Sequence, residues 1–351
     1  MQLRTSSGLK RLPAVLHSIL ARKGLAVAAL SDMKVFNQYV REATIETVAQ
    51  MVQQFNAASA GAIQLSTEGF DGDFLMRSMF SSLHSAQRRV DRYAANTSAS
   101  STALAQIQHN TVKVAGGFGP IEWEPSQLTW IQANPANAVA LISQNMAEAI
   151  LKDMLNTGIA SAVAAMENLG SSVVYDTSTE RAITYTDINN AHAKFGDMSQ
   201  LLVCDVMDGT TYHALIGQNL ANASELFQAG NVTVVNILNK RVVVTDAPAL
   251  RESPTTSSSD IKVLSLAVGG IVVHDAGDLV TNVETSNGSQ RIKTTMQADY
   301  TFGLGLKGYA WDTTAGGKSP TDAELATGSN WAKIATSHKH TAGVLTLSQT
   351  F

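Results

Sequence analysis

Charged residues are scarce in this sequence. Asp, Glu, Lys and Arg make up 15% of the 351 residues, against roughly 25% in a typical globular domain. Ala, Ser, Thr, Asn, Gln and Gly fill the shortfall. Because the cores of protein interfaces are depleted of charge, this composition is typical of a protein with extensive protein–protein contacts. A weakly charged monomer is the alternative interpretation.

Cysteine is nearly absent. Cys204 is the only one in the chain, which excludes an intramolecular disulfide. It ends the apolar run of residues 201–204, where a buried thiol that packs as a small hydrophobic side chain is expected rather than a nucleophile. Because no disulfide is needed, we expect the chain to fold in a reducing cytoplasm.

The sequence also lacks an excess of basic charge. Its formal net charge is −4 and its pI is about 6.1, whereas proteins that grip nucleic acid usually carry a basic footprint. Basic residues stand in pairs at 10–11, 22–23, 88–89 and 240–241, and we interpret each of the first three pairs as a solvated face. Specific DNA recognition is therefore not expected, although a protein that lines a DNA container is compatible with this charge.

Long apolar runs are missing as well. Residues 12–20 and 25–30 are apolar, but Arg22, Lys23 and Gly24 separate them, and each half is too short to span a bilayer. The apolar spacing predicts a short basic amphipathic helix over residues 12–20, suited to docking on a neighbouring subunit or an assembly partner. We expect neither a secretory signal nor a membrane segment.

The clearest structural signal is a long helix over residues 135–168. Asn134 supplies an N-cap and Pro135 the first helical position, and Leu169 with Gly170 ends the helix. At 1.5 Å per residue the helix is about 50 Å long. We interpret it as a structural spine.

Helices and strands alternate around this spine, which indicates an α+β fold with a central sheet. Further helices are expected over residues 31–60, 187–195 and 210–216, with weaker helical signals over 74–93. Strands are expected at 111–115, 121–123, 201–207, 232–238, 241–245, 290–304 and 343–348, together with an apolar strand pair over 261–274.

Two stretches are too polar to form elements of a core. Residues 64–119 are rich in Ser, Ala and Gly, and the tract 96–102 has too few large apolar side chains to fold alone. Because such a segment makes a poor element of a compact domain, we expect it to project and to acquire order from neighbouring molecules. Residues 253–260 are expected to form a polar loop.

No motif in the sequence predicts catalysis or phosphate binding. Residues 315–319 end like a phosphate-binding loop, but Asp312 stands where the first glycine is required and Pro320 blocks the following helix. Residues 303–308 are glycine-rich after a strand but lead to no helix, so a dinucleotide fingerprint is not expected. Asp205 and Asp208 lie around a strand end, and capping the next helix is the simpler role for Asp208.

No metal site is predicted either. His338 and His340 share a face if they lie on a strand, but no Cys or carboxylate accompanies them locally. Asp71 and Asp73 lack the remaining ligands of a calcium loop. We therefore predict no catalytic residues, no cofactor-binding residues and no metal ligands.

The order of several short motifs resembles the major capsid proteins of tailed bacteriophages. Residues 186–197 followed by 202–207 are similar to the helix, Gly-Asp and strand passage of that family. The runs 240–246, 300–311 and 329–331 match further parts of it. A Met-His-Ser commonly follows the strand in that family, whereas this chain has Met207, Asp208 and Gly209. The resemblance covers roughly residue 35 to the C-terminus.

The resemblance implies the Hong Kong 97 phage type of capsid fold, with an N-terminal arm, an extended loop, a peripheral domain that holds the long spine helix, and an axial domain. The implied ranges are residues 1–60 for the N-terminal helix and arm, 61–120 for the extended loop, 121–196 with 286–351 for the peripheral domain, and 197–285 for the axial domain.

The function implied is structural. Members of this family self-assemble into pentamers and hexamers that form the icosahedral head around double-stranded DNA, so the chain is expected in the virion after assembly in the host cytoplasm. Expected partners are many copies of itself, portal, scaffold and decoration proteins, and non-specifically contacted DNA, with no membrane. The alternatives are the shell of an encapsulin-like nanocompartment and a soluble α/β enzyme.

Overall fold

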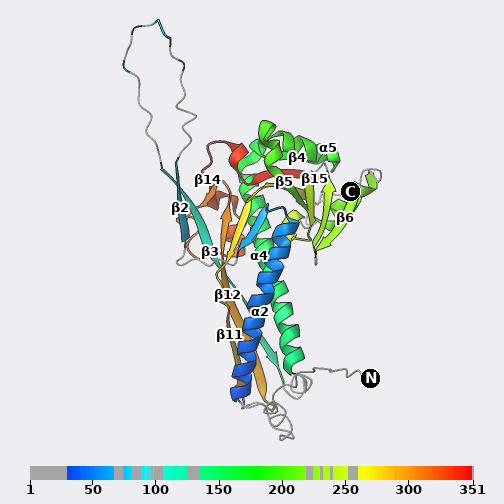
Figure 1. Ribbon diagram of the computed structural model, residues 1–351, viewed down its shortest axis with the longest axis vertical. Helices are drawn as coiled ribbons and strands as arrows, with labels where there is room; N and C mark the ends of the chain where they lie inside the picture. The colour runs from blue at the N-terminus through cyan, green and yellow to red at the C-terminus, as the bar shows by residue number, and fades with distance from the viewer. Residues whose placement is uncertain are drawn as a thin grey trace, which may run out of the picture.

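The computed structural model in Figure 1 describes most of the chain. The predicted helix at residues 12–20, the polar loop at 253–259 and, apart from Ser98, the tract 96–102 lie outside the described residues. The described residues are 30–66, 74–80, 106–124, 135–218, 224–229, 232–237, 240–251, 260–288 and 290–349, with 89, 91–93, 95 and 98.

Two long helices lie side by side along the molecule (Figure 1). They are α2, Leu30–Ala58, and α4, Pro135–Leu169, which confirms both predicted long helices. The 35 residues of α4 give a length of about 50 Å. Gly170 follows with φ +65°, a left-handed conformation that glycine adopts without strain, so the helix ends where the sequence predicts.

A six-stranded sheet packs against these helices. Its order is β1-β10-β12-β3-β2, and β11 also pairs with β12. The antiparallel β12–β3 pair runs from Leu304 opposite Val112 to Thr294 opposite Trp123, with an irregularity between Met296 and Ala298. The strands are β1 Ile63–Ser66, β2 Phe74–Phe80, β3 Gln106–Trp123, β10 Ile271–Asp275, β11 Val280–Ser286 and β12 Lys293–Leu306.

A seven-stranded sheet forms the other part of the molecule, in the order β4-β15-β9-β5-β8-β7-β6. Its β5–β8 and β15–β4 pairs are parallel, and the other pairs are antiparallel. The strands are β4 Val174–Ala182, β5 Leu202–Met207, β6 Ser224–Ala229, β7 Val232–Ile237, β8 Lys240–Val244, β9 Asp260–Ala267 and β15 Gly343–Gln349.

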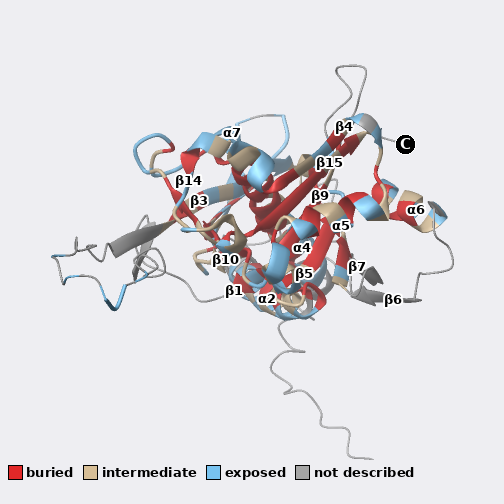
Figure 2. Cartoon of the chain, turned by 90° about the horizontal axis from the view of Figure 1, so that it is seen from above, coloured by how far each residue is buried: buried red, intermediate tan, exposed pale blue. Residues whose placement is uncertain are grey.

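Short helices cover one face of this second sheet. Ile188 of α5, Tyr185–Ala193, and Leu215 of α6, Gly209–Gln218, belong to a separate small core with Met207 and Val242. On the opposite face, Cys204 and Val206 belong to the main core, which also contains α4 residues. The burial colours in Figure 2 show that buried residues are concentrated in the strands of this sheet, such as β9 and β15.

The segment between β12 and β15 forms a small module beside α4. Its two-stranded sheet pairs β13, Tyr309–Trp311, with β14, Trp331–Lys333. The rings of Trp311 and Trp331 meet edge to face at 4.9 Å, and both are almost fully buried. The remaining turns are α7 Asp322–Leu325, η2 Gly170–Ser172, η3 Gly196–Leu201, η4 Pro248–Leu250, η5 Gly328–Asn330 and η6 His338–His340.

Several local predictions are wrong. The helical signals over 74–93 do not hold at Phe74–Phe80, which is strand β2, because pairing with β3 overrides the weak local preference. The separate strands at 111–115 and 121–123 are one continuous strand, β3. The predicted strand pair over 261–274 is two strands, β9 and β10, that do not pair with each other but lie in different sheets. The expected central sheet is therefore two sheets.

The sheets also divide the chain differently from the ranges that the resemblance implies. β4 and β15 fall in the implied peripheral ranges, yet both belong to the seven-stranded sheet, where β4 pairs with β15 and β15 pairs with β9. β10 and β11 fall in the implied axial range, 197–285, yet both pair with β12 in the six-stranded sheet. The crossing point is the turn at residues 268–270, where Gly269 has φ +66°.

Candidate functional site

A buried Ser-His-Asp cluster lies under α5. Nε2 of His192 is 3.0 Å from Oδ1 of Asp205 and 3.0 Å from Oγ of Ser265. Asp205 and Ser265 have no exposed surface, and His192 has 5%. The cluster joins α5, β5 and β9.

This cluster does not have the geometry of a nucleophilic triad. In such a triad one ring nitrogen of the histidine takes the serine proton while the other donates to the carboxylate. Here Asp205 and Ser265 share the same nitrogen of His192, and no substrate reaches a fully buried hydroxyl. The cluster therefore acts as an internal polar clamp that fixes α5 on the sheet.

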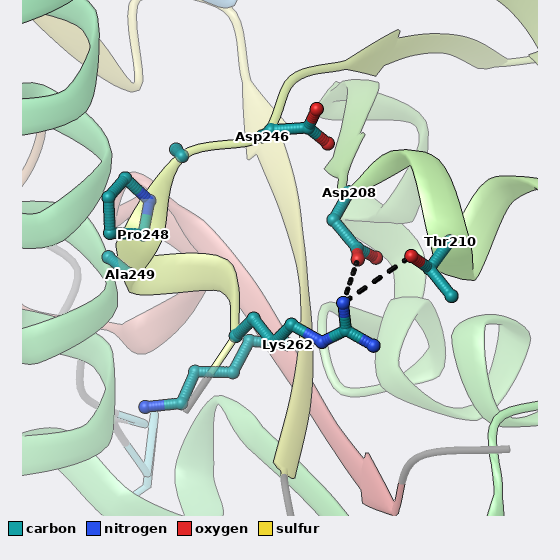
Figure 3. A pocket seen from close by; sticks show the side chains of 8 residues that line it. Asp208, Thr210, Asp246, Pro248, Ala249 and Lys262 are labelled. Atoms are coloured by element: carbon teal, nitrogen blue, oxygen red, sulfur yellow. Dashed lines mark hydrogen bonds and ion pairs between the residues drawn. The ribbon is translucent and has the colours of Figure 1, made fainter. Parts of the chain in front are cut away.

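A cavity of about 700 Å³ opens at the carboxyl ends of the parallel strands β5 and β8 (Figure 3). In open α/β sheets this is the position where ligands commonly bind. The lining includes Asp208, which follows β5, and Asp246, which follows β8. This is the place where an α/β enzyme would have its active site.

The polar groups of the cavity already have structural partners. Oδ1 of Asp208 accepts a hydrogen bond of 2.9 Å from the amide of Thr211, which confirms its predicted capping role. Asp246 accepts from the amide of Gly209 at 3.2 Å. The guanidinium of Arg251 lies 4.0 Å from Asp208 and 3.4 Å from the hydroxyl of Thr210, as the dashed lines in Figure 3 mark. The cavity is therefore lined by the capped N-terminus of α6, and an arginine contacts the capping residue.

The other chemical candidates of the sequence are dispersed. His338 and His340 lie in the turn η6 and not on a strand, and Nε2 of His338 contacts the carbonyl oxygen of Lys194. Cys204 is fully buried, and burial raises the pKa of its thiol far above the usual range. No group of three or more potential metal ligands occurs in the described part of the chain.

The glycine-rich candidates have ordinary structural places. Gly303 lies within β12, and Gly308 forms the tight turn into β13. Gly317 accepts a hydrogen bond from the indole of Trp311 and precedes no long helix. Asp71 and Asp73 lie outside the described residues. Among the described helices, none is long and apolar enough to cross a membrane.

The most distinctive feature is an elongated three-stranded ribbon made of β3, β12 and β11 (Figure 1). α2 and α4 lie against one of its faces, where Val283, Met296 and Ala298 pack into the main core. On the other face, residues at alternate positions are exposed: Val280, Asn282 and Glu284 of β11 and Gln297 and Asp299 of β12. Sequence reasoning missed this face, although the alternation in β11 is its signal.

One contact fixes the spine helix to this ribbon. The hydroxyl of Tyr300 in β12 donates a hydrogen bond of 2.7 Å to Oδ2 of Asp153 in α4. A Cβ at Gly116 would lie 2.7 Å from the Tyr300 ring, so β3 carries a glycine where the ring needs room. Burial raises the pKa of Asp153 and nearby Asp322 adds to this, while the Tyr300 hydrogen bond opposes both.

Comparisons with known proteins agree with this architecture. A family model described as major capsid protein 13-like matches residues 32–345. The capsid asymmetric unit of cyanophage Pam1 is similar with a TM-score of 0.50 and 11% identity, covering 82% of this chain and 88% of that chain. By sequence, no curated protein matches.

Two further solved structures are similar at lower scores. One is from Mycobacterium phage Adephagia, with a TM-score of 0.47 and 10% identity, covering 97% of this chain and 98% of that chain. The other is the encapsulin complex from Synechococcus elongatus, with a TM-score of 0.45 and 9% identity, covering 85% and 92%. The Pam1 likeness supports the Hong Kong 97 phage type of fold that the sequence predicts.

Proposed function

Because this chain belongs to the major capsid protein 13-like family, we propose that it builds an icosahedral phage head from pentamers and hexamers around double-stranded DNA. The family assignment itself confirms the resemblance to tailed-phage major capsid proteins. The protein is a structural component of the virion that assembles in many copies into a capsid shell, and it is not an enzyme.

One structural observation supports this function best. Among the described residues, the longest helix, α4, packs along a ribbon whose opposite face no described element covers. A large part of the described surface therefore lies far from the main core. An extended monomer gains little stability, because it buries a smaller fraction of its apolar surface than a compact protein of the same length. Contacts with further copies would supply the missing burial.

The four parts implied by the resemblance belong to this proposal. Residues 1–60 act as the N-terminal arm and residues 61–120 as the loop that overlaps a neighbouring copy, except that β3 is shared between this range and the ribbon. The ribbon with α4 forms the peripheral domain. The seven-stranded sheet forms the axial domain around fivefold and sixfold centres, so β4 and β15 belong with it and β10 and β11 with the peripheral domain.

Portal, scaffold and decoration proteins are the proposed partners of the assembled shell, together with DNA contacted without sequence specificity. Assembly is proposed to take place in the host cytoplasm. A net charge of −4 is consistent with a container that holds DNA without gripping it.

Electron microscopy of the purified full-length protein tests the proposal. We expect closed shells, or megadalton particles and capsomers in size-exclusion chromatography. A small compact species at all concentrations would contradict the shell function and would favour the alternative of an α/β enzyme. Shells from infected cells should hold nuclease-protected DNA. Shells that hold an enzyme instead would support the encapsulin-like alternative.

A further inference from the structure

The turn that follows β11 contains the only Asn-Gly sequence of the chain, Asn287 followed by Gly288. The last paired residues of β11 and β12 are Ser286 and Lys293, so Asn287 is the first residue beyond the ladder. Both residues of the Asn-Gly pair are exposed. The proposed shell function gives this pair no role.

An asparagine side chain carries an electrophilic carbon one residue away from a backbone nucleophile. The backbone nitrogen of the next residue attacks Cγ of the asparagine, and the ring that closes is a succinimide. Two features oppose this attack: a side chain on the next residue, which crowds the nitrogen, and hydrogen bonds that hold the reacting groups in place. Glycine removes the first obstacle, because it has no Cβ.

The turn at Gly288 removes both obstacles. Gly288 has φ +101°, a conformation that glycine adopts without strain, and a Cβ built there would meet no atom within 4 Å. Among the described residues, the amide of Gly288 has no backbone partner, and no hydrogen bond holds the side chain of Asn287. The nitrogen and the carbon that must meet are therefore both unrestrained by the described part of the chain.

Asn282, in the same hairpin, lacks these features although it is also exposed. It lies within β11 opposite Gln297, so the ladder holds its backbone. The next residue is Val283, which packs against the main core and carries a branched side chain beside the attacking nitrogen. Asn282 is therefore protected by its strand and by its neighbour, and not by burial.

Asp208 also precedes a glycine, and an aspartate closes the same ring by losing water. Here both reacting groups have other partners. Oδ1 of Asp208 accepts from the amide of Thr211 at 2.9 Å, and the amide of Gly209 donates to Asp246 at 3.2 Å. Asp208 is also only 4% exposed. A following glycine is therefore insufficient by itself, and the turn at Asn287 combines it with free groups.

We propose that Asn287 is a site of spontaneous deamidation. The backbone nitrogen of Gly288 gives up its proton and bonds to Cγ of Asn287, the bond from Cγ to Nδ2 breaks, and ammonia leaves with that proton. Water then adds to either carbonyl of the succinimide and breaks one of its ring C–N bonds. The product is an aspartate or an isoaspartate at position 287. Because water is the only co-reactant, the reaction needs no enzyme, metal ion or oxidant.

The modification changes the charge of the protein but not its strand pairing. A carboxylate replaces a neutral amide, so the formal net charge of −4 becomes −5. The altered backbone lies beyond the Ser286–Lys293 pair, so the β11–β12 ladder keeps all its partners. An assembly of many copies therefore becomes a mixture of charge forms as it ages.

Incubation of the purified full-length protein tests the site. Samples are held at neutral and at mildly alkaline pH, and peptide mass spectrometry follows the replacement of the amide by a carboxyl at Asn287 and Asn282. We expect Asn287 to react at least about tenfold faster than Asn282. Its rate should rise in proportion to the hydroxide concentration, because the attacking nitrogen must lose its proton. Labelling by an isoaspartate methyltransferase should appear at position 287 over the same period.

Two variants and one control identify the cause. Gly288→Ala should slow the reaction about tenfold or more, because a Cβ crowds the nitrogen, and Asn287→Gln should remove the product, because the longer side chain closes a larger ring slowly. Gly277→Ala replaces another exposed glycine of positive φ with open space around it, and it should leave the rate at Asn287 unchanged.

The comparison within the wild-type protein decides the proposal even if Gly288→Ala fails to fold. Equal rates at Asn287 and Asn282, or an amide at position 287 that is stable in alkaline solution, overturn the site. An unchanged rate in a folded Gly288→Ala protein overturns it as well. None of these results bears on the shell function, which is tested by particle formation.

Discussion

The Asp153–Tyr300 contact supports a quantitative prediction for Tyr300→Phe. The substitution removes one oxygen atom and leaves the ring above Gly116 and beside Phe118, with ring centroids 5.5 Å apart. It also removes the 2.7 Å donor of a partly buried carboxylate. A hydrogen bond to a charged group contributes about 1.5–3 kcal/mol, so we expect Tyr300→Phe to lower the free energy of unfolding by about 2 kcal/mol at pH 7.

The loss should depend on pH in a defined direction. Burial raises the pKa of Asp153 above its usual 3.8. For such a group the contribution to stability is complete below the pKa of the unfolded chain and is lost as the pH rises through the pKa of the folded protein. Without the Tyr300 donor the folded-state pKa rises further. The destabilisation should therefore be largest at neutral pH and smaller below about pH 4, where the carboxyl is neutral in both states.

Urea unfolding of unassembled subunits measures this effect through the fluorescence of the buried Trp311 and Trp331. Tyr175→Phe is the matched control, because its hydroxyl accepts only the neutral amide of Asn190 at 3.1 Å. It should cost about 1 kcal/mol or less, without this pH dependence. A Tyr300→Phe protein as stable as the wild type, or one destabilised more at pH 4 than at pH 7, refutes the reasoning.

Three further predictions concern the seven-stranded sheet and its surroundings. Gly343→Ala should lower the free energy of unfolding by about 3 kcal/mol, or leave the protein insoluble in expression trials, because the new Cβ would lie 2.0 Å from a carbonyl oxygen of β9. Gly217 has open space around it, so Gly217→Ala is the control and should be neutral or stabilising in the same urea assay. His192→Ala should lower the free energy of unfolding in urea by about 3–5 kcal/mol, because it leaves the buried Asp205 without its His192 partner. An unchanged urea midpoint would contradict the role of His192 in fixing α5 on the sheet. Cys204 should not react with a thiol reagent at pH 8 until the protein unfolds, because burial keeps the thiol protonated. Rapid labelling of Cys204 in the native protein would contradict this prediction.

The parts of the fold that local chemistry determines could be predicted from the sequence. Pro135 at the first helical position, a continuous apolar stripe and Gly170 after the last turn define α4 within a residue or two. The capping role of Asp208 was likewise readable, because its partner is only three residues away. Such signals need no knowledge of distant segments.

Non-local contacts explain most of what the sequence did not predict. Strand β2 exists because it pairs with β3, whose partner residues follow only after the segment 81–105. The division of β9 and β10 between two sheets depends on pairing with β15 and β12, far along the chain. The histidine clamp joins residues 13 and 73 positions apart, a distance at which no pattern of spacing indicates a contact.

The exposed outer face of the β3–β12–β11 ribbon was only half visible in the sequence. Val280, Glu284 and Asp299 lie on two strands whose relative register only the structure gives. A surface made of alternate residues from separate strands has no contiguous motif, so the alternation in β11 indicates an exposed strand face but not which strands lie beside it.

The position of α4 across both sheets has a mechanical consequence. Its Gly158 lies against Ile271 and Val273 of β10, while Glu167 forms an ion pair of 2.6 Å with Lys262 of β9. β9 and β10 are in turn joined by the three residues 268–270. If one sheet tilts relative to the other, either α4 must bend or the connection at residues 268–270 must twist. A displacement at the far end of the ribbon would therefore reach the seven-stranded sheet through α4, along its row of backbone hydrogen bonds.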